Sequence, residues 1–333
     1  MAESSLAVSV ALCTRNGMPF IVEQLSSILH QSVPPRQLVV SDDASTDGTV
    51  TTVREQLARF RAERPDVALE VRIIENDPPL GVTANFEQAI LACTGDIIVL
   101  SDQDDVWNEH RLARITEEFT EHPDLLLLHS DARLVDAAGA PLGESLSQGI
   151  GFSASEQGAV RDGRAFEVLL RRNVVTGATT AFRRSLVADA APFPASWVHD
   201  EWLAMVAAVT GRVDFLPEQL VDYRQHGSNE IGAGTPSTAD LWGRLREPRG
   251  ERNARLLARS EALAERFTEP RVSAEVTSAV QQKRVHERVR SGLPRMRVLR
   301  LWPVLREWMS GRYSRYGRAR YDVVRDLVQP SGR

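Results

Sequence analysis

The sequence predicts an α/β protein in which a mostly parallel sheet is flanked by helices and followed by a helical C-terminal region. In the first third of the chain, short apolar runs typical of buried strands alternate with amphipathic helical segments. Such alternation indicates parallel strands joined by right-handed crossovers. The second observation is a change of composition near residue 235, after which arginines and helical patterns dominate. We therefore expect a first domain over residues 1–235 and a mainly helical accessory region over residues 236–333.

The strands and helices of the first domain can be assigned from their patterns. Strands are short, apolar and rich in β-branched residues, whereas helices carry apolar residues at helical spacing. The Gly- and Ser-rich segment 143–158 is typical of a loop, and residues 228–240 are typical of a linker. Strands are expected at 6–13, 37–43, 69–74 and 96–102, with two further β elements in 125–139, and helices at 18–31, 49–60, 84–94 and 111–120.

The N-terminal residues and the cysteines favour a cytoplasmic protein. The first residues, MAESSLAVSVALC, lack the basic region of a signal peptide and are typical of the start of a strand. No run approaches the roughly 18 apolar residues that a membrane-spanning helix needs. Cys13 and Cys93 lie in apolar segments without metal-ligand spacing. We expect both to be small core residues in a reducing compartment.

Charge is distributed unevenly along the chain. Residues 1–239 contain 18 Lys and Arg against 34 Asp and Glu, whereas residues 240–333 contain 22 against 11. Lys283 is the single lysine, so nearly all of the positive charge is arginine. The acidic first domain argues against a nucleic-acid partner, and the basic C-terminal region favours an anionic neighbour.

Two acidic clusters lie where expected strands end. Asp42 and Asp43 end the second strand, and SDQDDVW (101–107) follows the apolar residues of the fourth. Ligands of open parallel sheets bind beyond the carboxyl ends of the strands, so we expect one shared crevice. Three carboxylates within four residues repel one another unless a positive charge lies among them. A D-x-D at this place suits Mg²⁺ or Mn²⁺ with a substrate phosphate, the alternative being a solvated acidic turn.

Five segments of the sequence share their order and spacing with a known family. They are CTRNGMPFIVEQLSSILHQ, VVSDDASTDGT, NFEQAILACTGDIIVLSDQDDVW, HDEW and YRQHGSNEIG. Together they resemble a family 2 glycosyltransferase with the GT-A fold of nucleotide-diphospho-sugar transferases. The D-Q-D-D-x-W form most resembles the rhamnosyltransferase subset. The resemblance covers residues 6–232 and leaves out the C-terminal region. It is specific because five segments match in order and spacing, whereas a D-x-D motif alone would be weak evidence for the family.

The resemblance implies which residues bind the donor nucleotide. In VVSDDAS the family's second Asp contacts the pyrimidine base, so Asp43 would take that role with support from Asp42. Thr14 would line the same site. At Arg15 the family usually has a Tyr lying against the base, so Arg15 would stack its guanidinium there or meet phosphate. Asn85 would approach the donor or, alternatively, cap its helix.

The resemblance also implies Mn²⁺ or Mg²⁺ as cofactor. Asp102 and Asp104 would hold the metal and the donor ribose or diphosphate, so the missing positive charge would be a cation carrying a nucleotide-sugar. In YRQHGSN, Arg224 would meet the diphosphate and His226 the metal. The alternative for this pair is a surface arginine and a loop histidine satisfied by the protein.

HDEW matches the segment that carries the family's catalytic base. Inverting transfer needs a group that deprotonates the acceptor hydroxyl, and Asp200 corresponds to it. Glu201 is adjacent, but successive residues of a helix do not share a face. His199 is expected at the helix start, and Trp202 either in the core or as a platform for a sugar.

Residues 295–321 carry eight arginines together with Leu, Val, Trp and Tyr residues. Arginine with interfacial aromatics suits an amphipathic helix on an anionic membrane, so this stretch is expected to make a peripheral contact with the inner face of the membrane. The alternative is a helical bundle with a solvated arginine face, packed on the catalytic domain or on a second copy in a homodimer.

The sequence thus predicts a metal-dependent inverting glycosyltransferase with a dTDP- or UDP-sugar donor. The sugar would be L-rhamnose and the acceptor a hydroxyl of a glycan or lipid-linked molecule. The same chemistry on a soluble secondary metabolite with a UDP-sugar remains an alternative. Two alternatives belong to other classes of protein. One is a haloacid-dehalogenase-like phosphatase with Asp102 as nucleophile, although its motif usually lies on the first strand, and the other is a non-catalytic nucleotide-sugar binder.

Overall fold

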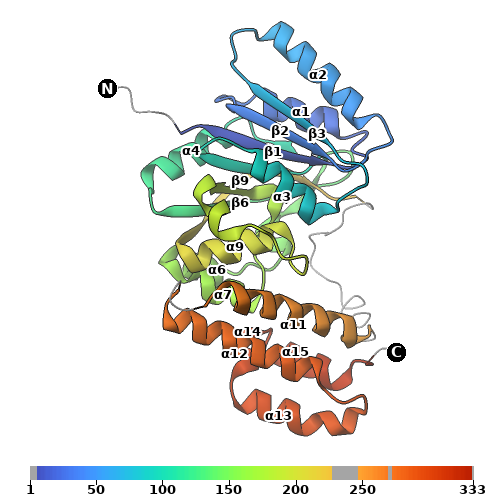
Figure 1. The fold of residues 1–333 in the computed structure, drawn as a ribbon, viewed down its shortest axis with the longest axis vertical. Coiled ribbons are helices and arrows are strands. Elements are labelled where there is room, and N and C mark those ends of the chain that lie inside the picture. The colour runs from blue at the N-terminus through green and yellow to red at the C-terminus, as the bar shows by residue number, and fades with distance from the viewer. Residues whose placement is uncertain (1–5, 227–246, 269–271, 332–333) are drawn as a thin grey trace. The chain divides into compact units, whose positions relative to one another are not determined.

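The structure is a computed structural model that describes residues 6–226, 247–268 and 272–331 (Figure 1). The chain divides into two compact units, one comprising residues up to 165 with residues 174–234, the other residues 166–173 with residues from 235 onward. The expected linker, 228–240, lies outside the described residues. No helix of the described residues is long and apolar enough to cross a bilayer.

The first unit is built on one mixed sheet with the strand order β3-β2-β1-β4-β8-β6-β9-β5, and β7 paired to β6. Its first four strands are parallel, as predicted, and are almost entirely buried except for the edge strand β3. Burial on both faces explains why their sequences are continuous apolar runs. These strands are β1 (Val8–Thr14), β2 (Gln37–Asp42), β3 (Glu70–Glu75) and β4 (Ile97–Ser101).

Beyond β4 the strand directions are mixed. β8 runs antiparallel to both β4 and β6, whereas β6 and β9 are parallel. The expectation of two β elements in 125–139 was wrong, because β6 is one strand that pairs with neighbours on both sides. The polar residues in its middle find partners within the protein: Asp131, for example, accepts hydrogen bonds from the backbone N–H and the hydroxyl of Ser147. The bounds are β5 (Val106–Trp107), β6 (Leu125–Val135), β7 (Pro141–Ser145), β8 (Thr180–Arg183) and β9 (Arg212–Arg224).

Helices flank this sheet. With right-handed crossovers, the strand order places α1 and α2 on one face of the sheet, where they pack on each other. The connection from β3 to β4 runs in the opposite direction, so α3 lies on the other face, against β1 and β2. The four predicted helices are confirmed to within a few residues. The longer helices are α1 (Ile21–Leu29), α2 (Thr49–Glu63), α3 (Val82–Ala92), α4 (Arg111–Glu121) and α9 (His199–Thr210); short turns are α5 (Leu146–Gly149), α6 (Ala154–Ala159), α8 (Val187–Ala190), η1 (Val160–Arg164), η2 (Gly177–Thr179) and η3 (Arg184–Leu186).

The segment 143–158, expected as a loop, contains the end of β7 and the short helices α5 and α6. Each helix begins with a capping box, formed by Ser145 with Gln148 and by Ser153 with Glu156. In each box the serine hydroxyl accepts from the backbone N–H of the third helical residue, whose side chain accepts from the backbone N–H of the serine. The glycines and serines that indicated a loop therefore include the caps of two helices.

The cysteines lie in the core, as predicted. Cys13 and Cys93 are buried free thiols. Burial raises the pKa of Cys93 to about 12, so neither its position nor its protonation favours reactivity.

The second unit is helical, as the C-terminal pattern predicted. Its longest helices, α11 and α12, pack against each other, and the shorter helices cover them. The elements are α7 (Ala165–Arg171), α11 (Arg249–Arg266), α12 (Ala274–Ser291), η4 (Arg297–Arg300), α13 (Leu301–Met309), α14 (Arg312–Tyr316) and α15 (Arg320–Val328).

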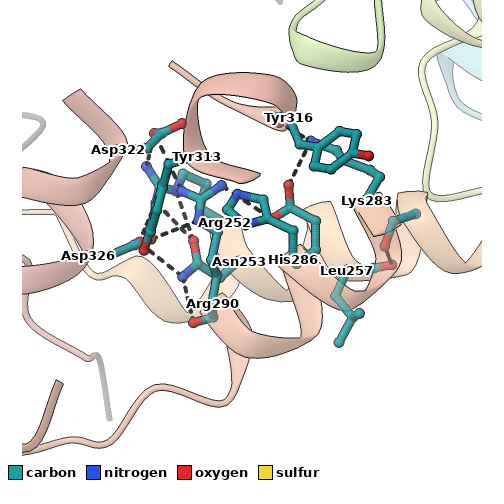
Figure 2. Close-up of polar contacts among 12 residues, drawn as sticks. Arg252, Asn253, Leu257, Lys283, His286, Arg290, Tyr313, Tyr316, Asp322 and Asp326 are labelled. Carbon is teal, nitrogen blue, oxygen red and sulfur yellow. Dashed lines mark hydrogen bonds and ion pairs between the residues drawn. The ribbon is translucent and has the colours of Figure 1, made fainter. Parts of the chain in front are cut away.

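A network of buried charges holds this unit together (Figure 2). Asp326 accepts from Arg290 Nε at 2.7 Å and from the Tyr313 hydroxyl at 2.8 Å, and also from Arg252. Carboxylates raise the pKa of Arg290 above its ordinary range although burial alone would lower it. The network buries Arg290, which lies before the stretch 295–321. Within that stretch Arg300 is buried and donates to backbone carbonyls, whereas six of the eight arginines are exposed, as a solvated arginine face would require.

The same network predicts loss of stability in acid. Burial alone would raise the pKa of Glu307, but hydrogen bonds from Arg312 and His286 lower it to about 2. Because the pKa of Glu307 is lower in the folded state, its ionised form stabilises the fold at pH values above the ordinary pKa of 4.5. This contribution is lost as the pH falls toward the pKa of the folded state. We expect the thermal unfolding midpoint to drop between pH 5 and 3, with a shallower drop in Glu307→Gln. An equal drop in that variant would contradict the assignment.

Candidate functional site

The candidate site lies where β1, β2 and β4 end. Thr14 is the last residue of β1, and its hydroxyl donates to Asp42 Oδ2 at 2.6 Å across the parallel pair. Asp42 also accepts from the backbone N–H and the hydroxyl of Ser45. Both side chains are buried, so the strand ends fix their geometry. The role of Asp42 as support for Asp43 stays a prediction.

Asp43 directly follows β2 at the same edge of the sheet. Its carboxylate accepts from the backbone N–H groups of Leu80 and Gly81, at 2.6 and 2.9 Å. The guanidinium of Arg15 lies 3.7 Å from it while remaining largely exposed. The exposed Arg15 is thus free to move over a ligand, with its backbone fixed by two hydrogen bonds to the Gln103 side chain.

Asn85 holds the strand beneath this region. Its amide donates to the Ser41 carbonyl at 3.0 Å and its oxygen accepts from the Ser41 hydroxyl and from Asn76. It lies inside α3, whose N-cap is Gly81, so the alternative of a helix cap was wrong. A direct contact with the donor stays a prediction.

In the acidic turn after β4, Asp104 and Asp105 have different partners. Asp104 Oδ2 lies 2.8 Å from His226 Nε2, and that imidazole stacks on Phe20. Asp105 is buried and accepts from the backbone N–H of Arg224, while its Oδ2 makes no hydrogen bond to any described residue. Burial and then the charges of Asp104 and Asp102 raise the pKa of Asp105 well above its ordinary value. Negative charge is thus in excess here.

Arg224 clamps this turn. It is buried, and its guanidinium donates to the Asp104 carbonyl at 2.7 Å, to the Ala137 carbonyl at 3.0 Å and to Glu23 at 2.6 Å. The alternative of a surface arginine was wrong. These contacts with the protein itself leave binding of the diphosphate as a prediction and show that Arg224 positions Asp104.

Arg111 was not singled out from the sequence. It is the first residue of α4, is fully buried, lies over the Trp107 ring and donates to the Ala178 carbonyl. Burial lowers its pKa to about 9, against the opposing effects of Asp105 and Asp102. A fixed cation thus lies beside the acidic turn, and its only sequence signal was an arginine at the start of the helix after that turn.

The donor set fits a divalent cation that carries a diphosphate. Mg²⁺ bound with a substrate takes one or two carboxylates and leaves further positions to phosphate and water. Asp102 and Asp104 supply carboxylate oxygens, His226 touches Asp104, and the raised pKa of Asp105 reflects burial and the neighbouring charges of Asp104 and Asp102, which a cation would offset. In the part of the chain that the structure describes, no three His, Cys, Asp or Glu side chains form a complete metal-binding group. The site therefore suits a cation that arrives with its nucleotide.

Asp200 lies at the start of α9. Its carboxylate accepts from the backbone N–H groups of Gly177 and Glu201, both at 2.7 Å. His199, the first residue of α9, stacks on Phe86 at 3.8 Å, and burial lowers its pKa to about 3. Trp202, left open between core and platform, is fully buried and donates its indole N–H to the Ala190 carbonyl.

Tyr223 connects the two halves of the site and was not predicted. Burial, followed by the charges of Asp102, Asp105, Asp104 and Asp200, raises its pKa above the ordinary value. One side chain of β9 is therefore within electrostatic range of both the acidic turn and the candidate base. Carboxylates that are far apart in sequence therefore act on the same buried hydroxyl.

Comparisons with known proteins agree with this geometry. Residues 9–187, more than half of the chain, match the family described as Glycosyl transferase family 2. The uncharacterized protein Rv1520 of Mycobacterium tuberculosis is 27% identical over 222 residues, which cover 66% of this chain and 59% of that protein. The chain thus spans less than two thirds of the length of this relative.

Two solved structures share the fold. The mannosyltransferase PcManGT of Pyrobaculum calidifontis, in complex with GDP-Man and Mn²⁺, has a TM-score of 0.55 at 20% identity and covers 92% of this chain and 75% of its own. TarS 1–349 of S. aureus, in complex with UDP-GlcNAc, has a TM-score of 0.52 at 18% identity and covers 96% and 90%.

A haloacid-dehalogenase-like phosphatase would carry its aspartate motif on the first strand, whereas here the motif follows the fourth strand, β4. The phosphatase alternative is therefore excluded, and the family match agrees. The fold is the GT-A-like fold predicted from the sequence. The chain belongs to glycosyl transferase family 2.

Proposed function

We propose that the protein is a metal-dependent inverting glycosyltransferase with a pyrimidine nucleotide-sugar donor. The observation that carries the proposal is the placing of Asp42 and the acidic turn at the ends of strands that both pair with β1, with the charges of Asp102, Asp104 and Asp200 all acting on the buried Tyr223. A donor at the acidic turn would then lie within reach of a base on α9. The Mn²⁺ in the PcManGT complex supports the choice of metal.

Asp43 and Arg15 would hold the base and Asp102 the ribose or diphosphate. Asp104, fixed by His226 and Arg224, would be the main metal ligand, and a divalent cation bound there would supply positive charge to the departing diphosphate. Asp200 would take the proton of the acceptor hydroxyl as its oxygen bonds to the anomeric carbon and the bond to the diphosphate breaks on the opposite face. The backbone N–H groups of Gly177 and Glu201 hold the two Asp200 oxygens in position.

For the finer identity, we propose L-rhamnose from dTDP-rhamnose, with a UDP-sugar as the second donor. The acceptor would be a hydroxyl of a glycan or a lipid-linked molecule. The D-Q-D-D-x-W form supports rhamnose. The UDP-GlcNAc of the TarS complex supports a pyrimidine nucleotide, whereas the GDP-Man of PcManGT shows that the fold accepts other bases.

A thermal-shift panel tests the donor site directly. The protein is heated with dTDP, UDP, GDP or CDP, each with Mn²⁺, Mg²⁺ or EDTA. A ligand at about 100 times its Kd stabilises the native state by about 2.7 kcal/mol, so a shift with one pyrimidine nucleotide and metal is expected. Asp104→Ala should abolish it.

The control is Asp124→Ala, which removes an exposed carboxylate whose ion pair with Arg212 measures 3.7 Å. It should keep the shift. Stabilisation that persists in EDTA or in Asp104→Ala would contradict the metal site, and stabilisation by GDP alone would contradict the assignment of Asp43 to a pyrimidine.

A further inference from the structure

The helix α13 turns its apolar residues outward. Trp302 is 68% exposed, Leu301 57% and Met309 68%. At 100° per residue these side chains share one face of the helix with Leu305 and Trp308, which are also exposed. Such a face normally packs on a core, so its exposure needs an explanation.

The opposite face of the same helix is polar and buried. Glu307 is 2% exposed, and its carboxylate binds His286 Nδ1 at 2.8 Å and both Nε and Nη2 of Arg312 at 2.6 and 2.8 Å. Val304 is buried beside it. The interior of this unit combines buried ion pairs with a small apolar cluster that includes Val304. Glu307 joins the ion pairs, and the leucines and tryptophans of α13 remain outside.

The apolar surface continues into the preceding turn, η4, and its approach. Met296, Val298 and Leu299 are all more than half exposed. Of the eighteen exposed large hydrophobic residues in the described chain, eight fall within residues 296–309. We call this surface the α13 face. Its concentration in one short segment distinguishes it from single apolar residues scattered over a surface.

The α13 face is bordered by positive charge alone. Exposed arginines lie before it, within it and after it, whereas Glu307, which is buried, is the single carboxylate between residues 291 and 321. A second copy of the chain would be a poor occupant, because a two-fold interface would bring like arginines together. The arginines are Arg295, Arg297, Arg306, Arg315, Arg318 and Arg320.

We propose that the α13 face binds the surface of an anionic lipid bilayer. Trp302, Trp308 and the neighbouring apolar side chains enter the boundary between headgroups and acyl chains, and the arginines contact lipid phosphates. This inference goes beyond the transfer reaction and does not depend on the sugar. It would bring the enzyme to the membrane, where a lipid-linked acceptor resides.

Vesicle cosedimentation tests the proposal on the full-length protein. Vesicles of equimolar phosphatidylglycerol and phosphatidylcholine should pellet the wild type, and pure phosphatidylcholine vesicles should pellet little. The double variant Trp302→Ser/Trp308→Ser should bind about tenfold more weakly. The control is Leu91→Ser/Leu142→Ser, which changes two exposed leucines of the first unit, and it should bind as the wild type does.

A second measurement covers the case in which the double variant fails to fold. The emission of the wild-type tryptophans should shift to shorter wavelength with anionic vesicles and be quenched by lipids brominated in the acyl chain. Absence of sedimentation and quenching would overturn the proposal, as would undiminished binding by a folded double variant. Light scattering that shows a dimer lost in the double variant, without vesicle binding, would assign the α13 face to a second copy and overturn it as well.

Discussion

Asp200→Asn should lower kcat by about 10²–10⁴-fold, the usual contribution of a general base. The amide has the shape of the carboxylate and can still accept from a backbone N–H, as Asp200 does from Gly177, but it cannot take the proton of an acceptor hydroxyl. The change is therefore expected in kcat and not in donor affinity. Release of nucleoside diphosphate from the donor measures kcat, and the nucleotide thermal shift measures binding.

Glu201→Gln is the matched control, because it makes the same chemical change one residue along α9. Neighbouring helix residues point in different directions, so this variant should keep most of the activity. Wild-type turnover in Asp200→Asn would contradict the assignment of the base, whereas nucleotide binding without turnover in the wild type would favour the non-catalytic nucleotide-sugar binder.

Asp326→Ala should lower the free energy of unfolding of the second unit by about 3–5 kcal/mol, because breaking a buried charge network leaves its cations without compensation. Asp326 is fully buried and accepts from Arg290, Tyr313 and Arg252. Hydrogen exchange of the α12 and α15 amides measures the loss locally, which avoids treating a chain of two units as a single transition.

Glu261→Ala is the control on the same unit. Glu261 forms an ion pair with Arg288 at 3.3 Å in which both side chains are exposed, and such pairs contribute about 0–1 kcal/mol. If the two variants changed hydrogen exchange equally, the buried network would have no special part in holding these helices.

The first half of the fold could be predicted because its information is local. Continuous apolar runs gave the buried parallel strands, and parallel strands place their carboxyl ends at one edge. Thr14, Asp42 and the acidic turn were therefore expected together, and they are together in the structure.

The partners and burial of individual charged side chains could not be predicted, because they depend on contacts between residues that are far apart in sequence. Arg224 looked like a ligand for phosphate, yet its guanidinium is bound to Glu23, to Ala137 and to the turn at Asp104. In the C-terminal region, most arginines of residues 295–321 are exposed, but Arg290 is buried because carboxylates of its own helix, α12, and of α15 surround it. Which arginine is enclosed depends on packing and not on its neighbours in sequence.

The clamp formed by Arg224 sets an order of events during synthesis. Asp104 and Arg224 are 120 residues apart, and Glu23 and Arg224 are 201 apart. At about 5–20 residues per second, a ribosome needs roughly 6–24 s to pass from the acidic turn to the arginine that fixes it. The early strands can pair during that interval while Asp104 and Asp105 still lack the contacts that hold them. The nascent chain would thus contain all of the residues that match the family, 9–187, before its acidic turn is held, and a product that terminates after residue 187 would lack Arg224 altogether.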